Sequence, residues 1–330
     1  MPKRSSRRTT KSKSQQLSRS EIQETEANSR AVTRRFLRGR ASVWKRWHAD
    51  AATREAAPRA TRQQPDIKPN VQRALVGAPS RGTLIAQGDS WFDYPLHDVL
   101  KMLNDEHAYE IESVAHAGDR IENMAYNVAE LDGFVRVLEK TLRRGVVPRA
   151  ILLSGGGNDI AGVEFGMMLN HAGSSLPITN DDVVNGVLGK RIPAAYIYII
   201  TRLNETCSHY LTAPLPILMH GYAHPVPDGR GFSVFGWHWG FPGPWLKPGF
   251  DEKELENRRA NTAAMQELID RFNDVIAGVA AQFPNAHYLD LRPLLSNGPK
   301  YRNDWDNELH PTEAGFRLVG NEFARALASL

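Results

Sequence analysis

The alternation of short apolar runs with amphipathic stretches after residue 82 constrains the fold of this 330-residue chain most strongly. The short runs are typical of buried strands, and the longer stretches repeat apolar residues at helical spacing. Strands that alternate with helices predict a parallel sheet with helices on both faces. We therefore expect a three-layer α/β/α sandwich around a mainly parallel five-stranded sheet. The expected strands are 83–87, 110–115, 150–154, 215–220 and 287–291, and the expected helices are 97–105, 121–143, 194–211, 252–282 and 312–329.

The charged residues divide the chain into two parts. Residues 1–82 hold 20 Lys and Arg but only 6 Asp and Glu, a formal charge of +14, whereas the remainder carries −10. Residues 1–20 are almost devoid of apolar side chains, which favours disorder. Residues 21–56 show helical spacing of apolar residues, and residues 57–82 contain four prolines typical of a linker. We expect a basic N-terminal extension over 1–82 and a folded domain over 83–330.

The basic extension has three interpretations. A helix with Val32, Phe36, Val43 and Trp47 on one face would bind an anionic membrane surface. The lysines and arginines of residues 1–60 would also suit nucleic-acid phosphates. Alternatively, the segment is a solvated tail that docks on the acidic remainder. The sequence leaves these three partners open, and it indicates no obligate protein partner.

The sequence features that bear on location favour the cytoplasm. The chain has one cysteine, Cys207, which cannot form an internal disulfide. Residues 33–38 are similar to a twin-arginine export signal, but the motif is one residue short and no apolar segment follows it. No window approaches the length of an apolar membrane span. We expect a cytoplasmic protein, either free or peripheral at the membrane through its basic extension.

Four polar motifs follow the expected strands or precede the last expected helix. They contain Ser90 after the first strand, Gly118 after the second, Asn158 after the third, and His310 near the C-terminus. Ligands of open α/β sheets bind beyond the carboxyl ends of the strands. We therefore expect these residues to meet at one site.

In their order and context the four motifs resemble those of the SGNH, or GDSL, hydrolases, a family named for a Ser, a Gly, an Asn and a His. The resemblance covers about residues 83–330 and implies a flavodoxin-like sheet and an esterase or lipase activity. Each family residue corresponds to one position here, namely Ser90, Gly118, Asn158 and His310.

These residue types also suit ester hydrolysis on chemical grounds. A serine hydroxyl becomes a nucleophile when a base takes its proton, and an imidazole such as that of His310 can accept it near neutral pH. The backbone N–H groups of Ser90 and Gly118 and the side-chain amide of Asn158 would hold the oxyanion. This chemistry requires no metal and no organic cofactor.

Simpler roles exist for the same residues. Ser90 could cap a helix, Asn158 could belong to a glycine-rich turn, and His310 could precede a helix start. His220 and His224 stand four residues apart, but the intervening Gly221 argues against a metal-binding helix. At the level of function, a catalytically weak adaptor with the same fold, or an acyltransferase, would be compatible with the motifs.

The residue that orients His310 is ambiguous. The family resemblance implies an Asp three residues before the histidine, and this chain has Asn307 there. An amide can orient an imidazole but cannot stabilise an imidazolium by charge. The neighbouring Asp306 is the alternative.

Residues 228–251 are rich in aromatic side chains, with seven of the 28 aromatics of the chain. Long loops beside a site are often binding walls. We expect this loop to wall an apolar acyl or aromatic pocket, with Trp237 and Trp239, as well as Trp91 and Asp159, in contact with substrate. The alternative is a loop that packs on its own. The expected substrate is a small-molecule or lipid ester, such as a phospholipid, an acetylated sugar or an aryl ester.

Overall fold

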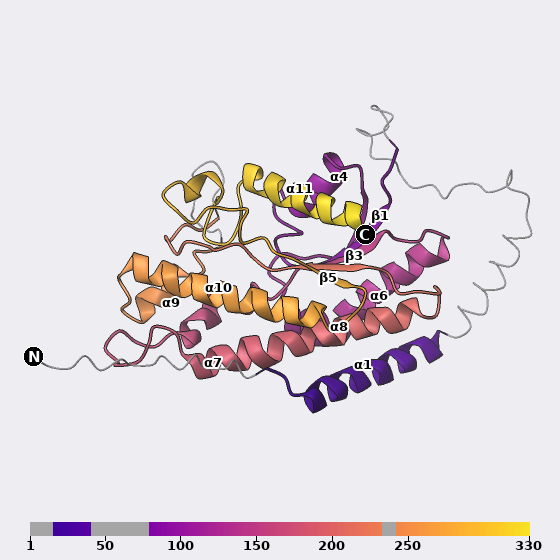
Figure 1. The fold of residues 1–330 in the computed structure, drawn as a ribbon, viewed down its shortest axis with the longest axis horizontal. Helices are drawn as coiled ribbons and strands as arrows, with labels where there is room; N and C mark the ends of the chain where they lie inside the picture. Colours follow the sequence, from indigo (N-terminus) through magenta and orange to yellow (C-terminus); the bar gives the residue numbers. More distant parts are fainter. Residues whose placement is uncertain (1–15, 41–78, 233–241) are drawn as a thin grey trace, which may run out of the picture.

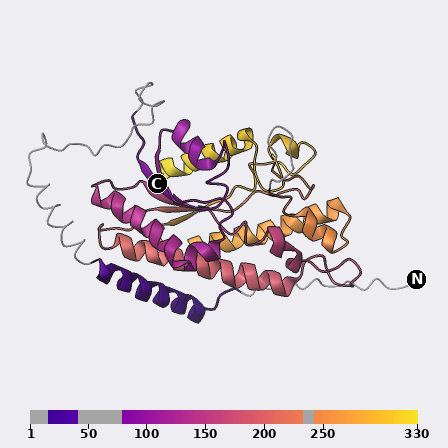
Figure 2. The ribbon, with the colours of Figure 1, turned by 180° about the vertical axis from the view of Figure 1, so that it is seen from behind.

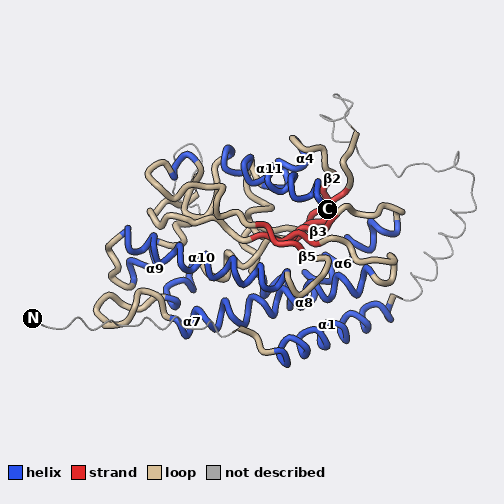
Figure 3. The backbone as a smooth tube through the Cα atoms, in the orientation of Figure 1, coloured by secondary structure: helices blue, strands red, loops and turns tan. Residues whose placement is uncertain are grey.

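A computed structural model describes residues 16–40, 79–232 and 242–330. Its centre is a five-stranded parallel sheet in the order β2-β1-β3-β4-β5 (Figure 3). The predicted fold class is confirmed, and each strand lies within two residues of its expected position. The strands are β1 (Thr83–Gln87), β2 (Glu110–Ser113), β3 (Ala150–Leu153), β4 (Ile217–His220) and β5 (Ala286–Leu289).

Helices cover both faces of the sheet. Helices α4 and α11 lie on one face, and α6, α8 and α10 lie on the other (Figure 1). Strands β1, β3 and β4 are buried along their whole length, which fits their mostly apolar sequences. The helices of this part are α4 (Val99–Asp105), α5 (Ile121–Tyr126), α6 (Val128–Arg143), α7 (Asp181–Gly186), α8 (Ile192–Cys207), α9 (Lys247–Glu252), α10 (Arg258–Ala280) and α11 (Glu313–Ser329).

Two expected helices are each divided by an asparagine that caps a new helix. The stretch 121–143 divides at Asn127, whose side chain accepts a hydrogen bond from the Ala129 N–H at 3.0 Å. The stretch 252–282 divides before α10, where Asn257 accepts from the Ala260 N–H at 3.2 Å. Asparagine is favoured at such caps because its side chain satisfies a helix donor that has no partner within the helix.

The register of the sheet brings the loops after four strands to one edge. Gln87 of β1 and Met219 of β4 both pair with Leu153 of β3, and His220 of β4 pairs with Leu289 of β5. The residues that follow these positions therefore leave the sheet side by side. The Ser90 and Asn158 motifs lie in two of these loops.

Helix α1 (Arg19–Gly39) packs along α8 on the side away from the sheet (Figures 1 and 2). Its buried residues are Ser29, Thr33 and Leu37, and the Ser29 hydroxyl donates to the Tyr198 carbonyl oxygen of α8 at 2.8 Å. Leu37 is 1% exposed. This part of the basic extension is thus packed against the α/β layers.

The face of α1 that meets α8 only partly coincides with the apolar face expected from the sequence: Phe36 belongs to both, and Val32 does not. Val32 is 41% exposed, and the Phe36 ring lies below the guanidinium groups of Arg40 and Arg202, at 5.4 and 5.0 Å. Short polar side chains at 29 and 33 allow the two helices to approach, a pattern that hydropathy alone does not reveal. The expected continuation of this face, at residues 43 and 47, lies outside the described residues.

None of the helices in the described ranges is long and apolar enough to cross a membrane.

Candidate active site

Strand β1 ends at Gln87, and at the next residue, Gly88, the chain turns tightly against β3. A Cβ atom at Gly88 would lie 2.6 Å from the Ser154 Cβ, so no larger residue fits. The Asp89 N–H donates to the Ser154 carbonyl oxygen at 3.2 Å and continues the pairing for one more residue. Ser90 follows directly, so the close approach of the two strands fixes where its side chain begins.

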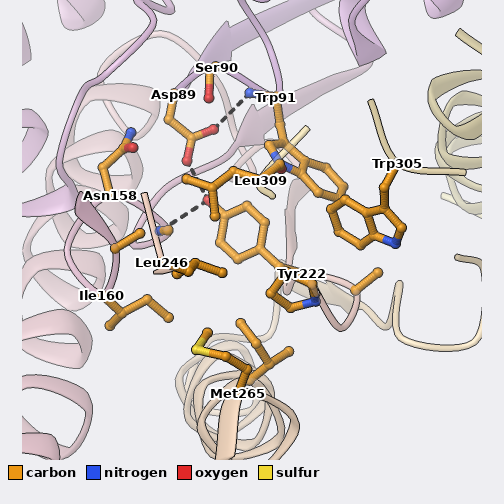
Figure 4. A pocket seen from close by; sticks show the side chains of 15 residues that line it. Asp89, Ser90, Trp91, Asn158, Ile160, Tyr222, Leu246, Met265, Trp305 and Leu309 are labelled. Carbon is orange, nitrogen blue, oxygen red and sulfur yellow. Dashed lines mark hydrogen bonds between the residues drawn. The ribbon is translucent and has the colours of Figure 1, made fainter. Parts of the chain in front are cut away.

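The buried carboxylate of Asp89 stabilises this turn by hydrogen bonds. It is 2% exposed, and its carboxylate accepts hydrogen bonds from the Trp91 N–H at 3.0 Å, the Ser154 hydroxyl at 2.8 Å and the Tyr222 hydroxyl (Figure 4). Tyr222 in turn accepts from the Gly157 N–H at 3.3 Å. One buried carboxylate therefore connects the loops after β1, β3 and β4.

His310 lies against Ser90, with 2.7 Å between His310 Nε2 and Ser90 Oγ. The two residues are 220 positions apart, and the fold brings them into hydrogen-bond contact. His310 is 4% exposed, and burial lowers its pKa to about 3. The imidazole is therefore neutral near pH 7 and has a lone pair available for the serine proton.

Asn307, rather than Asp306, contacts the imidazole. Its Oδ1 accepts from the Leu309 N–H at 3.0 Å, the His310 N–H at 3.0 Å and His310 Nδ1 at 2.9 Å. Because backbone N–H groups can only donate, the atom that faces them is the amide oxygen. This arrangement assigns the ring proton to Nδ1 and leaves Nε2 as the acceptor that faces Ser90.

Of the predicted oxyanion donors, Ser90 and Asn158 line the cavity, and Gly118 is not among its lining residues. The Asn158 amide donates to the Asp119 carbonyl oxygen at 2.9 Å, and Asn158 lines the same cavity as Ser90. Gly118 has a φ of +91°, which favours glycine. Within the described ranges, neither the Ser90 N–H nor the Gly118 N–H has a hydrogen-bond acceptor. Both groups are available to a ligand oxygen.

The four residues expected to touch substrate have different positions. Trp91 is 3% exposed and lines the cavity, and its indole N–H donates to the Leu309 carbonyl oxygen at 3.1 Å. Asp159 instead accepts from the Ile121 N–H at 2.9 Å at the start of α5, and burial raises its pKa to about 6. It is not among the residues that line the cavity. Residues 237 and 239 lie outside the described part of the chain.

The cavity beside Ser90 has a volume of about 40 Å³ and opens to solvent. Side chains from the ends of β1 and β4 and from α10 surround it, and Met265 lies at the end away from Ser90 (Figure 4). The lining is mostly apolar, and its one carboxylate, that of Asp89, is engaged in the contacts described above. The apolar lining residues are Trp91, Ile160, Ala161, Ala223, Pro225, Leu246, Met265, Ile269, Trp305 and Leu309.

Glu308 is a site residue for which the sequence provided no role. It is fully buried. Its carboxylate accepts four backbone hydrogen bonds from the two ends of the aromatic-rich segment 228–251, which we call the aromatic loop. The donors are the N–H groups of Gly229 at 2.9 Å, Trp245 at 2.7 Å, Leu246 at 2.7 Å and Lys247 at 3.0 Å. Burial raises the pKa of Glu308, and the four donors oppose that shift. Its position beside His310 ties the loop to the imidazole.

The described ends of the aromatic loop contact the residues around His310. The Trp245 ring meets the imidazole edge to face, with centroids 5.2 Å apart and an angle of 74°. Phe232 meets Tyr94 in a similar way at 5.5 Å. Tyr94, also without a role in the sequence reading, stacks on His310 at 4.2 Å. The loop thus contributes to the enclosure of the imidazole.

Comparisons with known proteins found similarity in structure only. No protein-family model matches the sequence, and no curated protein matches it. A catalytic mutant of Axe2, an acetylxylan esterase from Geobacillus stearothermophilus, is 13% identical over 76% of this chain and 95% of its own, with a TM-score of 0.44. A proposed GDSL-like lipase from Parabacteroides merdae is 14% identical over 76% and 96%, with a TM-score of 0.39.

A third similar structure is LAE5, an alpha/beta hydrolase enzyme from the metagenome of Lake Arreo in Spain. It is 14% identical over 76% of this chain and 97% of its own, with a TM-score of 0.40. At such identities and TM-scores the likeness carries no statement about chemistry, which rests on the residues of the site. Structures described as SGNH or GDSL-like hydrolases and esterases are thus among those to which this chain is similar.

Proposed function

We propose that this chain is a serine ester hydrolase with Ser90 as the nucleophile and His310 as the general base and acid. The observation that carries the proposal is the 2.7 Å contact between Ser90 Oγ and His310 Nε2, combined with the proton assigned to Nδ1. Ser90, His310 and Asn307 follow one another in hydrogen-bond contact as nucleophile, base and orienting group. This arrangement is typical of nucleophilic catalysis.

The reaction proceeds through an acyl-enzyme. Ser90 Oγ attacks the ester carbonyl carbon while His310 Nε2 takes the hydroxyl proton. The tetrahedral intermediate collapses, the C–O bond to the alcohol breaks, and His310 returns the proton to the leaving oxygen. Water then attacks the acyl carbon, His310 accepts a proton from it, and the carboxylic acid leaves as Ser90 regains its hydrogen.

Three donors are proposed for the oxyanion: the N–H groups of Ser90 and Gly118 and the Asn158 side-chain amide. The two N–H groups have no acceptor in the described part of the protein, and Asn158 borders the cavity that contains Ser90. Removal of one such donor typically lowers turnover by about 10²–10³.

The apolar cavity supports an uncharged acyl or aryl group as the part of the substrate nearest to Ser90. Met265 and Ile269 of α10 and Trp305 present hydrocarbon surface there. A charged group would have to lose its hydration in this cavity without a partner, which is costly. The proposed substrate class is therefore an ester with a neutral, apolar acyl group.

A fluorophosphonate probe tests the proposal directly, because it reacts covalently with an activated serine. Wild-type protein is expected to be labelled, whereas Ser90→Ala and His310→Gln are not. Ser208→Ala is the matched control, since Ser208 is exposed at the end of α8 and its hydroxyl donates to the Glu205 carbonyl oxygen at 2.7 Å. Folded wild-type protein that remains unlabelled, or equal labelling of Ser90→Ala, would contradict the assignment.

The other functions considered from the sequence correspond to outcomes of the same experiments. A folded protein that is never labelled would favour an adaptor that has lost catalysis. Labelling followed by transfer of the acyl group to added alcohols, rather than to water, would identify an acyltransferase. Product analysis by mass spectrometry distinguishes the free acid from the new ester.

A further inference from the structure

The amide of Asn307 is held on both sides. While Oδ1 faces His310, Nδ2 donates to the Tyr94 hydroxyl at 2.8 Å and to Asp306 Oδ2 at 3.2 Å. The Tyr94 hydroxyl donates to the same Asp306 oxygen at 3.0 Å. Three polar atoms from two distant segments thus form a closed triangle behind the amide.

Every hydrogen-bonding capacity of the Asn307 side chain is used in this arrangement. The two hydrogens of Nδ2 have two acceptors, and Oδ1 has three donors. Asn307 is 1% exposed, so a rotated amide would leave several buried groups without partners. The Asp306 side chain is exposed except where it reaches this triangle.

We propose that Asp306 and Tyr94 are positioning residues that lock the Asn307 amide so that its oxygen faces His310 Nδ1. The inference rests on the proposed function and extends it. The family resemblance implies a single carboxylate in contact with the histidine. In this chain two groups take its place: the Asn307 amide contacts the imidazole, and the Asp306 carboxylate lies one hydrogen bond further away.

The same geometry explains why an aspartate does not fit at position 307 while Asp306 is present. A carboxylate there would put an oxygen about where Nδ2 lies now, 2.8 Å from the Tyr94 oxygen and 3.2 Å from Asp306 Oδ2. Tyr94 has one proton for two carboxylates, and the two negative charges would repel each other. The amide at 307 and the carboxylate at 306 are therefore a matched pair.

Tyr94 has a second role through its ring. The phenol stacks on the imidazole with centroids 4.2 Å apart and an angle of 17°. This stack covers one face of the imidazole, and such burial favours the neutral ring that can accept the Ser90 proton. The hydroxyl of Tyr94 thus contributes to the orientation of Asn307, and its ring contributes to the burial of His310.

A charge-swap experiment tests the proposal. The variants are Asn307→Asp, Asp306→Asn and the double variant that exchanges the two groups, each assayed for kcat and KM on a p-nitrophenyl ester. Asn307→Asp is expected to lose on the order of tenfold in kcat, and the double variant to regain most of that loss. A single Asn307→Asp that equals wild type, or a double variant no better than the single one, would overturn the proposal.

Spectroscopy provides a readout that does not depend on activity. The ¹⁵N NMR signals of His310 are expected to show Nδ1 protonated and Nε2 unprotonated in the wild type. Tyr94→Phe, which keeps the ring, is expected to mix the two tautomers and to lower kcat several-fold at unchanged KM. Tyr126→Phe, at a half-exposed position on α5, is the control.

The two readouts separate the possible failures. If no ester is hydrolysed and no probe reacts, the proposed function fails, but the NMR comparison still tests the lock. If the His310 tautomer is the same in wild type, Tyr94→Phe and Asp306→Asn, the lock itself is refuted, whatever the activity.

Discussion

The Tyr94 ring covers the His310 imidazole face to face, at a centroid distance of 4.2 Å. Together with Trp245, which meets the imidazole edge to face, it separates the base from solvent. Burial of this kind stabilises the neutral imidazole and determines the pH range over which the base can act.

The first prediction concerns pH. Because burial lowers the pKa of His310 to about 3 from an ordinary 6.5, the neutral base persists as the pH falls through 6 and 5. We expect kcat/KM on a neutral ester to hold down to about pH 5 and to decline only as the pH approaches the folded pKa. An acidic limb centred near 6.5 in the pH–rate profile would contradict this.

The same shift affects folding, which must be monitored in parallel. Between pH 6.5 and about 3 the unfolded chain binds a proton at His310 and the folded chain does not. Stability contributed by His310 is therefore fully present above pH 6.5 and is lost as the pH falls through this window. Circular dichroism at each assay pH separates loss of the base from loss of the fold.

The second prediction concerns Glu308. In Glu308→Gln, an amide nitrogen would replace one of the two oxygens that accept the four backbone N–H groups. Each buried donor left without a partner costs about 1–3 kcal/mol, so we expect at least that loss in the free energy of unfolding and a lower kcat/KM. Urea denaturation provides the measurement. Glu267→Gln, a change at an exposed position in the middle of α10, is expected to leave both values unchanged.

The third prediction concerns Asp159. Its folded pKa is raised to about 6 by burial, from an ordinary 3.8, so stability is lost as the pH rises through 6. Asp159→Asn retains an acceptor for the Ile121 N–H and removes the charge. We expect its stability gain over wild type to grow by up to about 3 kcal/mol between pH 4 and pH 8. For the exposed control Asp105→Asn, any change in stability is expected to be independent of pH. The same result for Asp159→Asn would show that the folded pKa of Asp159 is not raised.

The fourth prediction concerns the cavity. Met265 lies at the end away from Ser90, so Met265→Ala lengthens the apolar space. We expect the preferred acyl chain of p-nitrophenyl esters to increase by about two to three carbons, since each buried methylene contributes about 0.8 kcal/mol. Met167→Ala, at a position 66% exposed, is the control. An unchanged chain-length profile would show that the acyl group binds elsewhere.

The fifth prediction concerns helix α1. Leu37 is 1% exposed at its contact with α8, and Arg40 Nε lies 2.7 Å from Oε2 of Glu139, a carboxylate that is itself buried. Leu37→Ala is expected to lower the free energy of unfolding by about 2–4 kcal/mol without altering probe labelling. Val32→Ala, at the exposed side of the helix, should cost much less. Equal losses would show that α1 does not pack on α8 in solution.

The sequence predicted the parts of this fold that depend on local patterns. Apolar runs located all five strands, and the polar motifs after β1 and before α11 contain Ser90 and His310, which lie in hydrogen-bond contact. Helix breaks at Asn127 and Asn257 were missed because asparagine inside an amphipathic pattern indicates a cap only when the next turn starts a new direction. Such a change of direction is set by tertiary packing.

The rest depended on contacts between distant segments. Nothing near Tyr94 indicates that its ring covers a histidine 216 positions later or that its hydroxyl reaches Asp306. The choice between Asn307 and Asp306 could be made only when the three donors around Asn307 Oδ1 were known. Asp159 follows Asn158 in the motif, yet its carboxylate accepts from the Ile121 N–H of α5. Adjacent side chains on a turn point in different directions, so the motif alone does not show which of them faces the cavity.

Glu308 has a consequence for how such a protein can acquire new specificities. It grips both ends of the aromatic loop by backbone N–H groups, which every residue type except proline supplies. Substitutions at other positions of the loop leave these four hydrogen bonds available, because no side chain of the loop takes part in them. Chimeras joined at positions 229 and 245 would therefore keep the Glu308 anchor while the loop between them is exchanged.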